Sequence, residues 1–395
     1  MHLYATEREA RRRRVRRRRL VALGIACAVI VLAAAGAWAL THNGGAPSPG
    51  TGAAAGIVAT PSATAHPSGS AAPAPTPPAV ITVGWVGDTT PGSMYGTPPE
   101  GGRALFGALP PLLRKPDLMI ANLEGTYSTP GPSKCAGDSS GVCFAFQAPP
   151  SYAGALAWSG IDLVNVANNH SNDYLTRGFE QTRQALRKAG VAFAGLPGRV
   201  TIVTVRGVRV AVVGFSPYPW SAPLNDIPAA ARLVRRAAAE ADVVIVLMHA
   251  GAEGSTEIHT PYGSESAFGE DRGNVRAFSH AMVDAGADLV LGSGPHVIRG
   301  IERYRNRLIA YSLGNFAGWH NFGLGGNLSL SGLLTVKIDA TGRVIGGRWL
   351  SLYVASPGVP AVDRSSTSLK LVRSLSATDF AHTYRFDSRG TFTRQ

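Results

Sequence analysis

Uninterrupted runs of aliphatic residues recur along the chain from residue 81 onward. No polar residue breaks Val243–Leu247, which is typical of a strand that is buried on both faces of a sheet. Runs of this kind predict strands at Ile81–Val86, Leu118–Asn122, Leu163–Ala167, Val200–Val205, Val208–Phe215, Val243–Met248, Leu289–Leu291, Leu308–Tyr311, Leu333–Ile338 and Arg348–Tyr353.

Stretches rich in Ala, Arg and Leu lie between these runs. They predict helices at Ser151–Trp158, Gly178–Ala189, Pro228–Ala239 and Asn274–Ala285. The strands Val200–Val205 and Val208–Phe215 are joined by Arg206-Gly207, which predicts a hairpin. Buried strands that alternate with helices predict an α/β domain whose sheets are covered by helices, and the hairpin makes these sheets mixed.

A different pattern occupies the N-terminus. Leu20–Leu40 carries no charged residue over 21 positions. At about 1.5 Å per residue, a helix of this length matches the roughly 30 Å hydrocarbon core of a membrane. Arg11–Arg14 and Arg16–Arg19 precede the span, which predicts a single-pass membrane protein with residues 1–19 in the cytoplasm and the C-terminal domain outside the cell membrane. The alternative is a cleaved signal peptide, whose apolar region normally covers only about 7–15 residues.

The segment after this predicted span, residues 41–79, carries eight prolines and no charge. With so few large aliphatic residues it cannot bury enough surface to offset the entropy of ordering, so we expect a flexible linker. Residues 80–357 then form the α/β domain. Residues 358–395 show only scattered apolar positions, and the sequence assigns them no structure.

The formal net charge of +13 raises the question of nucleic-acid binding. Nine Arg and two Glu lie within the first twenty residues, so +7 of this charge belongs to the block before the predicted span. The remaining 375 residues carry 29 basic and 23 acidic groups, which is an ordinary balance. We therefore expect the membrane, and no nucleic acid, as the partner of the basic block.

Three cysteines are too few for a disulfide-rich fold. Cys27 lies inside the predicted span and is expected to act as a small apolar residue. Cys135 and Cys143 bracket a Gly-, Ser- and Asp-rich stretch, and an oxidising exterior permits a disulfide that closes this short loop. A zinc-binding pair is the alternative, although two further ligands are missing nearby.

Polar residues gather where the predicted strands end. Five strands carry such residues at or just after their carboxyl ends: Asp88; Asn122 with Glu124; Asn168, Asn169 and His170 with Asp173; His249 with Glu253; and His296. In α/β sheets the carboxyl ends of strands form the ligand-binding crevice, so we expect these side chains to converge. Each residue alone is more often a helix cap or a satisfied polar group.

Carboxylate, amide and imidazole groups together suit a divalent metal such as Mn, Fe, Zn or Mg, bound as one or two ions. Two ions about 3.5–4 Å apart would clamp a phosphoryl oxygen and generate a hydroxide at neutral pH. A carboxylate such as Asp88 and an amide such as Asn169 fit such a site. His170 would then protonate a leaving group or hold an oxyanion, or else it is a turn residue bonded to the backbone.

Read in order, these segments resemble the CapA family of capsule and poly-γ-glutamate synthesis proteins, which have a metallophosphatase-like fold. The resemblance covers Val80–Tyr353, and it is carried by Gly87-Asp88, Ala121-Asn122-Leu123-Glu124, Ala167-Asn168-Asn169-His170 with Asp173 and Gly178, His249-Ala250-Gly251-Ala252-Glu253, Gly294-Pro295-His296-Val297 and Tyr311-Ser312-Leu313-Gly314-Asn315-Phe316. It implies a four-layer α/β/β/α sandwich of mixed sheets and a role in the export, attachment or assembly of an anionic envelope polymer such as poly-γ-glutamate, together with partners of a capsule-synthesis complex.

The strand-end chemistry and the resemblance together give a set of expected roles. The expected metal ligands are Asp88, Asn169, His249 and His296. The expected catalytic residues are His170, Glu124 and Asp173, and the expected substrate contacts are Asn122, Glu253 and Asn315. Glu124 and Glu253 remain open between ligand, base and hydrogen-bond support. The Gly314-Asn315 pair is alternatively a simple turn.

The chain departs from the pattern that such enzymes usually show. The usual Asp-x-His opening is reduced to Gly87-Asp88, a simplification that CapA relatives share. Ala250 stands where a Trp is usual, and Gly294 stands where many CapA relatives keep a His. One expected ligand is therefore absent, which leaves two metals, one metal or a polar crevice without hydrolysis as alternatives.

Two functions follow as hypotheses. The first is a membrane-anchored, metal-dependent hydrolase or transferase that acts on a phosphoryl or amide centre of the polymer. The second is a non-catalytic factor that binds or tethers the polymer. The chain has no Walker loop, so ligation driven by ATP would need a separate partner. The loop Thr256–Glu265, with Glu257, His259, Tyr262 and Glu265, either covers the crevice or is a solvated surface loop.

Overall fold

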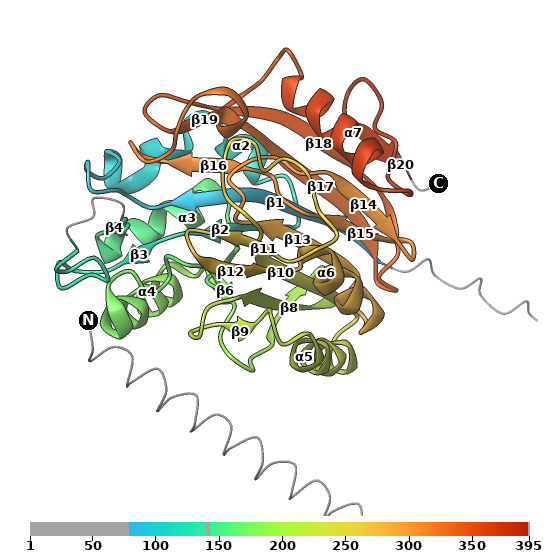
Figure 1. The fold of residues 1–395 in the computed structure, drawn as a ribbon, viewed down its shortest axis with the longest axis horizontal. Helices are drawn as coiled ribbons and strands as arrows, with labels where there is room; N and C mark the ends of the chain where they lie inside the picture. The colour runs from blue at the N-terminus through green and yellow to red at the C-terminus, as the bar shows by residue number, and fades with distance from the viewer. Residues whose placement is uncertain (1–78, 139–142, 394–395) are drawn as a thin grey trace, which may run out of the picture. The chain divides into compact units, whose positions relative to one another are not determined.

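The computed structural model describes residues 79–138 and 143–393 (Figure 1). The predicted membrane span and nearly all of the predicted linker lie outside the described residues. No helix in the part of the chain that the structure describes has both the length and the apolar character needed to cross a bilayer.

The larger sheet has nine strands and is mixed (Figure 1). In spatial order they are β19 (Val359–Val362), β18 (Val344–Ala355), β17 (Leu330–Asp339), β1 (Val80–Thr90), β2 (Leu118–Leu123), β5 (Leu163–Asn165) and β6 (Ala192–Ala194), with β16 (Asn315–Gly318) paired to β1 and β20 (Thr391–Thr393) paired to β18. The run from β1 to β6 is parallel, whereas β17, β18 and β19 pair antiparallel.

The smaller sheet has seven strands, and its parallel centre is flanked by two hairpins. Its strands are, in order, β14 (Ile301–Tyr304), β15 (Arg307–Ala310), β13 (Leu289–Ser293), β10 (Val243–His249), β8 (Val208–Ser216) and β7 (Thr201–Val205), with β9 (Ala222–Pro223) paired to β8. The predicted hairpin is confirmed, because β7 and β8 pair antiparallel around Arg206-Gly207.

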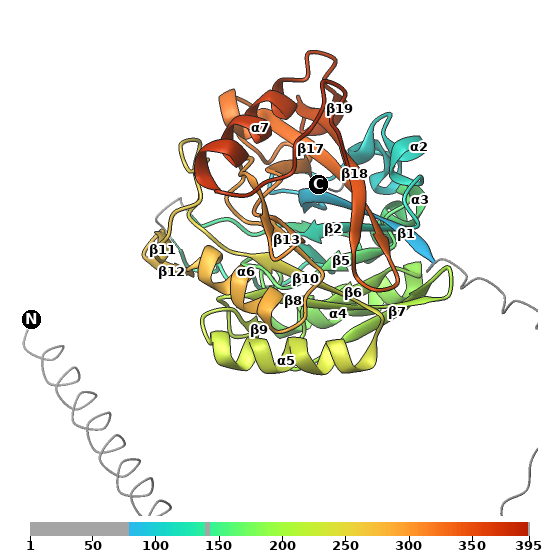
Figure 2. The same ribbon diagram turned by 90° about the vertical axis from the view of Figure 1, so that its right-hand side faces the viewer.

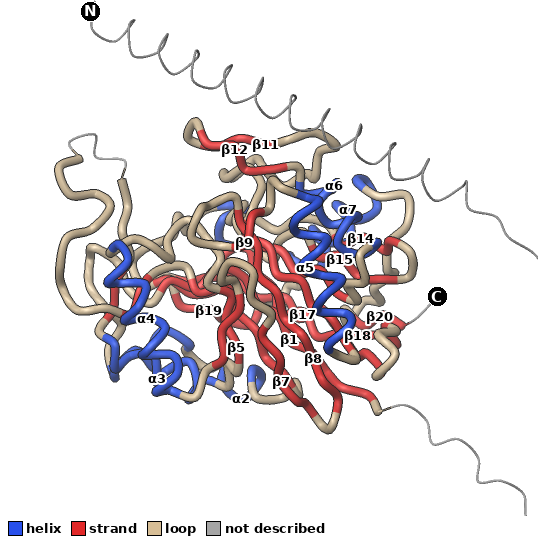
Figure 3. The backbone as a smooth tube through the Cα atoms, turned by 90° about the horizontal axis from the view of Figure 1, so that it is seen from below, coloured by secondary structure: helices blue, strands red, loops and turns tan. Residues whose placement is uncertain are grey.

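The helices are short, and two small strand pairs complete the domain. The helical segments are η1 (Glu100–Phe106), α2 (Pro110–Leu113), η2 (Pro150–Ala153), α3 (Gly154–Ser159), α4 (Leu175–Ala189), α5 (Ile227–Glu240), α6 (Val275–Asp284), η3 (Gly326–Ser329) and α7 (Thr367–Asp379). The small strand pairs are β3 (Thr126–Tyr127) with β4 (Gln147–Ala148), and β11 (Glu265–Ala267) with β12 (Glu270–Gly273). The β11–β12 hairpin lies apart from both sheets (Figures 2 and 3).

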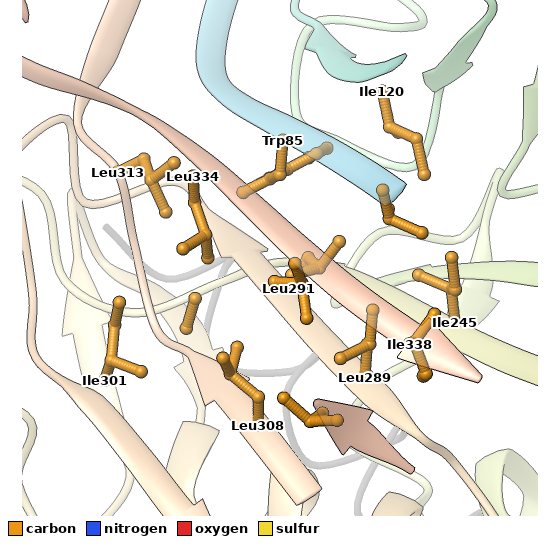
Figure 4. Packing of buried hydrophobic residues seen from close by; sticks show 14 of the residues in the cluster. Trp85, Ile120, Ile245, Leu289, Leu291, Ile301, Leu308, Leu313, Leu334 and Ile338 are labelled. Carbon is orange, nitrogen blue, oxygen red and sulfur yellow. The ribbon is translucent and has the colours of Figure 1, made fainter. Parts of the chain in front are cut away.

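Three hydrophobic clusters define the layers. The first lies between the sheets and joins Trp85 and Ile120 of the larger sheet to Ile245 and Leu291 of the smaller one (Figure 4). The second packs α3 and α4 on the outer face of the larger sheet, and the third packs α5 and α6 on the outer face of the smaller sheet. The layer order is therefore α/β/β/α with mixed sheets, as the resemblance implied.

The ten predicted strands and four predicted helices are confirmed as elements, with ends that differ by a few residues. Some short strands were not predicted: the Asn315–Gly318 strand β16 contains no aliphatic run, although it pairs with β1 beside Asp88. Residues 358–393, which the sequence left unassigned, form β19, α7 and β20. Leu369, Val372 and Leu375 of α7 join the cluster between the sheets.

Asp288 directly precedes β13 and contacts the starts of its two neighbouring strands, β10 and β15. Its carboxylate accepts a hydrogen bond from the backbone N–H of Val244 at 2.8 Å, and it lies 2.9 Å from the guanidinium of Arg307. Burial raises the pKa of Asp288 to about 6, although the Val244 N–H and Arg307 both act to lower it. The folded protein therefore holds this proton more tightly than the unfolded chain does.

We predict that ionisation of this carboxylate lowers the free energy of unfolding by about 1–3 kcal/mol as the pH rises from about 4 through about 6. In Asp288→Asn the amide oxygen still accepts the Val244 N–H, but no proton is lost over this range. The measurement is the free energy of unfolding by urea at several pH values. The stability of the wild type relative to Asp288→Asn should decrease across this range, and a constant difference contradicts the prediction.

Candidate functional site

The carboxyl ends of the central strands of the two sheets meet at one edge of the domain. In the larger sheet Asp88 lies in register with Asn122 of the neighbouring parallel strand, and in the smaller sheet His249 lies in register with Ser293. The indole N–H of Trp85 donates to Gly292 O at 3.2 Å and ties one sheet to the other near this edge. Residues far apart in the sequence are thereby brought together, as parallel strand ends predict.

Asp88, Glu124 and His296 form the densest group at this edge. One ligand atom from each lies within 4.8 Å of the other two. His296 Nδ1 is 3.3 Å from Asp88 Oδ2, and His296 Nε2 is 3.6 Å from Glu124 Oε1. Two carboxylates and an imidazole in such proximity are a donor set for a divalent cation.

Glu124 shows that this group fits a cation. Its side chain is fully buried, and neither carboxylate oxygen has a hydrogen-bond partner among the described residues. Burial raises the pKa of Glu124 well above its ordinary value, and the charges of Asp88 and Glu253 raise it further, against the opposing effect of His296. An unpartnered buried carboxylate is costly, and a bound metal ion would satisfy both oxygens.

His296 is oriented by Asn315. The Asn315 amide nitrogen donates to Leu328 O at 3.1 Å, so its oxygen faces His296 Nδ1 at 2.8 Å and accepts the proton there. Nε2 of His296 is left facing Glu124, as in metal sites where a histidine donates its other N–H to an oxygen. Burial alone would lower the pKa of His296, but Glu124 and Asp88 raise it well above the ordinary value.

His249 is held in the opposite tautomer by a chain of side-chain amides. Asn165 and Asn168 donate to Asn122 Oδ1 at 3.0 and 3.3 Å, so the Asn122 amide nitrogen faces Asp88 Oδ1 at 2.8 Å and His249 Nδ1 at 3.1 Å. His249 Nδ1 therefore accepts, and its proton lies on Nε2, 3.7 Å from Glu124 Oε1. Burial lowers the pKa of His249 well below its ordinary value. In this state His249 presents a proton to the site, and its role as a metal ligand stays a prediction that requires Asn122 to release Nδ1.

Asp88 is the charged member of the group. Burial alone would raise its pKa, but the hydrogen bond and charge of His296, the charge of His249 and the Asn122 amide together lower it. The backbone N–H of Gly294 also donates to Asp88 Oδ2 at 3.3 Å. Asp88 is therefore the anion around which the other groups are arranged.

Gly294 cannot be replaced by a ligand on this backbone. Its φ is +113°, and a Cβ there would lie 2.9 Å from both the N and the O of Ala250. A histidine side chain at position 294 therefore has no room on this backbone. His296, two residues later, also has a positive φ of +61°. Asp88, Glu124 and His296 therefore gain no further ligand from position 294.

His170 lies beside this group, with Asp173 and Lys134. His170 Nδ1 is 2.9 Å from Asp173 Oδ2, which also accepts from Phe146 N at 2.6 Å, and Lys134 Nζ lies 2.7 Å from Asp173 Oδ1. The imidazole thus donates from Nδ1 and leaves Nε2 with a lone pair. Burial lowers the pKa of His170, against the opposing charge of Asp173, so the ring is neutral at rest.

A pocket of about 900 Å³ opens over the site. Five of the predicted site residues line it: Asn169, His170, Glu253, His296 and Asn315. The other five, Asp88, Asn122, Glu124, Asp173 and His249, have buried side chains and are not among its lining residues. Asn169 Oδ1 is buried without a hydrogen-bond partner among the described residues, as expected for an atom available to a ligand.

Some residues of the pocket were missed by the sequence interpretation. Arg272, almost fully buried, ion-pairs with Glu253 at 2.5 Å and places a cation in the pocket wall. Lys134 is another, and Trp220 and Tyr218 add an aromatic wall. Arg272 is 23 positions after His249 with no motif around it, so only the fold reveals it. The adjacent Cys135–Cys143 disulfide, by contrast, is confirmed.

The loop Thr256–Glu265 has a structural role. Glu265 accepts both guanidinium Nη groups of Arg299, at 2.9 and 2.6 Å, and His259 lies 2.8 Å from Asp379. Tyr262 is 80% exposed, and none of Glu257, His259, Tyr262 and Glu265 lines the described pocket. Of the two alternatives for this loop, a cover over the crevice gains no support from the lining of the described pocket. Phe268, Glu270 and Arg272, which follow them, do line it.

The family model of the bacterial capsule synthesis protein PGA_cap matches residues 82–318, which is more than half of the chain. The chain belongs to this family. The match contains every predicted site residue, and the resemblance to CapA proteins is confirmed.

Two relatives carry the CapA name. The PGA biosynthesis protein CapA of Bacillus subtilis (strain 168) is 28% identical over 61% of this chain and 64% of its own length. The capsule biosynthesis protein CapA of Bacillus anthracis is 30% identical over 42% of this chain and 43% of its own. The chain thus spans less than two thirds of either relative.

Among solved structures, the 5'-nucleotidase precursor from Thermus thermophilus is similar with a TM-score of 0.41 and 15% identity. The similarity covers 69% of this chain and 54% of that protein. This level of similarity adds nothing on activity.

We predict that Glu124→Gln abolishes most of the stabilisation that a divalent cation gives. Gln keeps the size of Glu124 but loses the charge that binds a cation. A ligand present at about 100 times its Kd stabilises by about 2.7 kcal/mol. The measurement is the Tm of the purified full-length protein with and without Mn²⁺. The control is Glu240→Gln at the end of α5, whose Tm should rise with Mn²⁺ as much as that of the wild type does. If Mn²⁺ raises the Tm of Glu124→Gln as much as that of the wild type, Glu124 is not a ligand of the cation.

We also predict that Mn²⁺ binds more tightly at about pH 8 than at about pH 6. The pKa values of Glu124 and His296 are raised, so protons compete with a cation for these two groups more strongly at low pH. Raising the pH therefore weakens the competition of protons with the cation. The measurement is Mn²⁺ affinity by calorimetry at both pH values, where a proton release on binding should also appear. Affinity that is independent of pH would show that these groups are not the ligands.

Proposed function

We propose that the chain is a capsule-synthesis protein of the CapA type whose site binds one divalent metal ion and hydrolyses or transfers a phosphoryl or amide group of an anionic envelope polymer such as poly-γ-glutamate. The observation that carries the proposal is Glu124, a buried carboxylate with both oxygens unpartnered among the described residues, beside Asp88 and His296. Family membership supports a role in capsule synthesis, and the Bacillus subtilis relative is named for PGA biosynthesis.

Asp88, Glu124 and His296 would hold the ion, with Asn169 as a further oxygen donor from the pocket wall. A bound divalent ion supplies Lewis acidity and lowers the pKa of water. The chain itself supplies the remaining groups. Arg272 places a positive charge in the pocket wall, held there by Glu253, where it neutralises an anionic substrate group.

His170 is the acid–base residue of this proposal. His170 Nδ1 donates its proton to Asp173 Oδ2, with 2.9 Å between the two atoms. The neutral ring can therefore accept a proton at Nε2 from a nucleophile and later return it to the leaving group. Lys134 neutralises Asp173, which keeps the resting imidazole uncharged. His249 donates from Nε2 toward the group that Glu124 and Asp88 surround, and Asn122 fixes it in that state.

We further propose that the domain lies outside the cell, anchored by Leu20–Leu40 behind its arginine block. The Cys135–Cys143 disulfide supports this location, because disulfides persist mainly in oxidising compartments. A capsule-synthesis role at the outer surface of the membrane is consistent with such an anchor. Partners within a capsule-synthesis complex are part of the same proposal.

A second candidate, a non-catalytic factor that binds or tethers the polymer, is favoured by Gly294. The backbone there leaves no room for a further ligand, so the site carries fewer metal ligands than a two-metal hydrolase needs. In this candidate the same pocket binds the polymer, and the cation completes the binding surface.

The deciding experiment compares turnover and binding in the full-length protein, His170→Ala and Asp88→Asn. The substrates are a small phosphoester and poly-γ-glutamate, each with Mn²⁺, Zn²⁺ or Mg²⁺. We expect turnover that depends on the metal and that falls by about 10²–10⁴-fold in His170→Ala. The matched control is His382→Ala, an exposed histidine after α7, which should keep full turnover.

The outcomes separate the two candidates. Polymer binding without turnover, unchanged in His170→Ala, supports the non-catalytic factor and rejects the enzyme. Loss of turnover in His170→Ala with retained binding supports the enzyme. Absence of both binding and turnover contradicts both candidates.

A further inference from the structure

A second pocket of about 540 Å³ lies next to the first. It is lined by three arginines, Arg183, Arg187 and Arg199, and by a single carboxylate, Glu180. Its lining therefore has an excess of two positive charges. The first pocket has no such excess, because Lys134, Arg272 and His296 face three lining carboxylates above the buried Asp88 and Glu124.

The fold explains why these arginines share one pocket. Arg183 and Arg187 are four residues apart on α4, so they lie on the same face of the helix. Arg199 follows β6, and β6 contacts α4. Each of the two helical guanidinium groups lies over an aromatic ring, Arg183 over Phe179 at 5.5 Å and Arg187 over Phe193 at 5.4 Å. The rings hold the cations in place without neutralising them.

These charges are largely uncompensated. Glu180 ion-pairs with Arg183, whereas neither Arg187 nor Arg199 has a carboxylate within ion-pair distance in the part of the chain that the structure describes. Arg183 Nε is also buried without a hydrogen-bond partner among the described residues. Guanidinium groups that are held in position but unpaired are suited to carboxylates or phosphates from outside the chain.

Trp220 connects the two pockets, since it lines both. Its indole N–H donates to Asn168 O at 2.8 Å, two residues before the proposed acid–base residue His170. Tyr218 stacks on the same indole at 5.3 Å with the rings 12° apart. Trp220 is therefore a fixed wall with the pocket of the candidate metal site on one side and a basic pocket on the other.

We propose that the Arg183–Arg187–Arg199 pocket is a subsite for the carboxylates of a polyanionic chain, poly-γ-glutamate, whose neighbouring segment occupies the metal-binding pocket across Trp220. The inference rests on the proposed function and adds how the polymer is held. In the first pocket the lining carboxylates offset the lining cations, so polymer carboxylates that lie away from the metal ion and Arg272 need cations nearby. The basic pocket supplies them at a fixed distance from the reacting group.

The subsite also implies a specific kind of selectivity. A small substrate fills only the metal-binding pocket, so its turnover does not depend on the arginines. A long polymer occupies both pockets, so its binding gains from the arginines and weakens with salt. The arginines therefore select for polymer length without taking part in the chemistry.

The test uses the full-length protein with the substitutions Arg187→Gln and Arg199→Gln together. The matched control is Arg232→Gln with Arg235→Gln, two arginines on α5, outside both pockets. The measurement is the affinity for poly-γ-glutamate at low and high salt, with the Tm of every variant recorded. If the double variant has a lowered Tm, Arg199→Gln alone is used instead, because Arg199 is an exposed loop residue.

We expect the double variant to bind the polymer about tenfold more weakly at low salt, with a smaller loss for Arg199→Gln and less than about a twofold change in the control. The difference between wild type and double variant should shrink at high salt. Turnover of the small phosphoester should stay unchanged.

Equal polymer binding by the wild type and the double variant overturns the subsite while leaving the proposed function intact. Failure of the wild type itself to bind the polymer or turn over any substrate contradicts the proposed function instead. Single-stranded DNA of the same charge serves as the competitor. If it binds as tightly and loses as much affinity in the double variant, the assignment to a polycarboxylate is wrong.

Discussion

The structure depends on how two buried carboxylates, Asp88 and Glu124, are tolerated where the two sheets meet. Asp88 is surrounded by donors from both sheets, whereas Glu124 has none for its two oxygens among the described residues. A buried carboxylate without partners costs several kcal/mol unless it is protonated or bound to a cation. The orientation of His296, the tautomer of His249 and the pocket above them all surround this unpartnered carboxylate, which supports the proposal that the site binds a cation.

This arrangement explains why one part of the site could be predicted from the sequence. Asp88, Asn122, His249 and His296 each follow an aliphatic strand, and the carboxyl ends of parallel strands converge whatever their order in the chain. The same logic predicted the covered sheets and the hairpin. It did not predict β16, because Asn315–Gly318 has no aliphatic run and is a strand only through its pairing with β1. The C-terminal α7 was missed because its apolar positions are sparse and become a face only against β17 and β18.

Other parts could not be predicted because they depend on three-dimensional contacts. Arg272 and Lys134 come from segments without a motif, and their partners Glu253 and Asp173 are distant in the chain. The opposite tautomers of His249 and His296 follow from which way the amides of Asn122 and Asn315 point, and those are set by Asn165, Asn168 and Leu328. Sequence predicts which groups meet, and the hydrogen-bond network decides which of them carries a proton. The basic pocket beyond Trp220 could not be predicted either, because it combines arginines from a helix face with one from a loop.

We propose that one divalent cation lies between Asp88, Glu124 and His296. The most direct measurement is anomalous diffraction from crystals of the protein grown with Mn²⁺. We expect a single strong anomalous peak within coordination distance of Glu124, Asp88 and His296 Nε2. The absence of a peak there, or a peak bound only by residues elsewhere on the molecule, would contradict it.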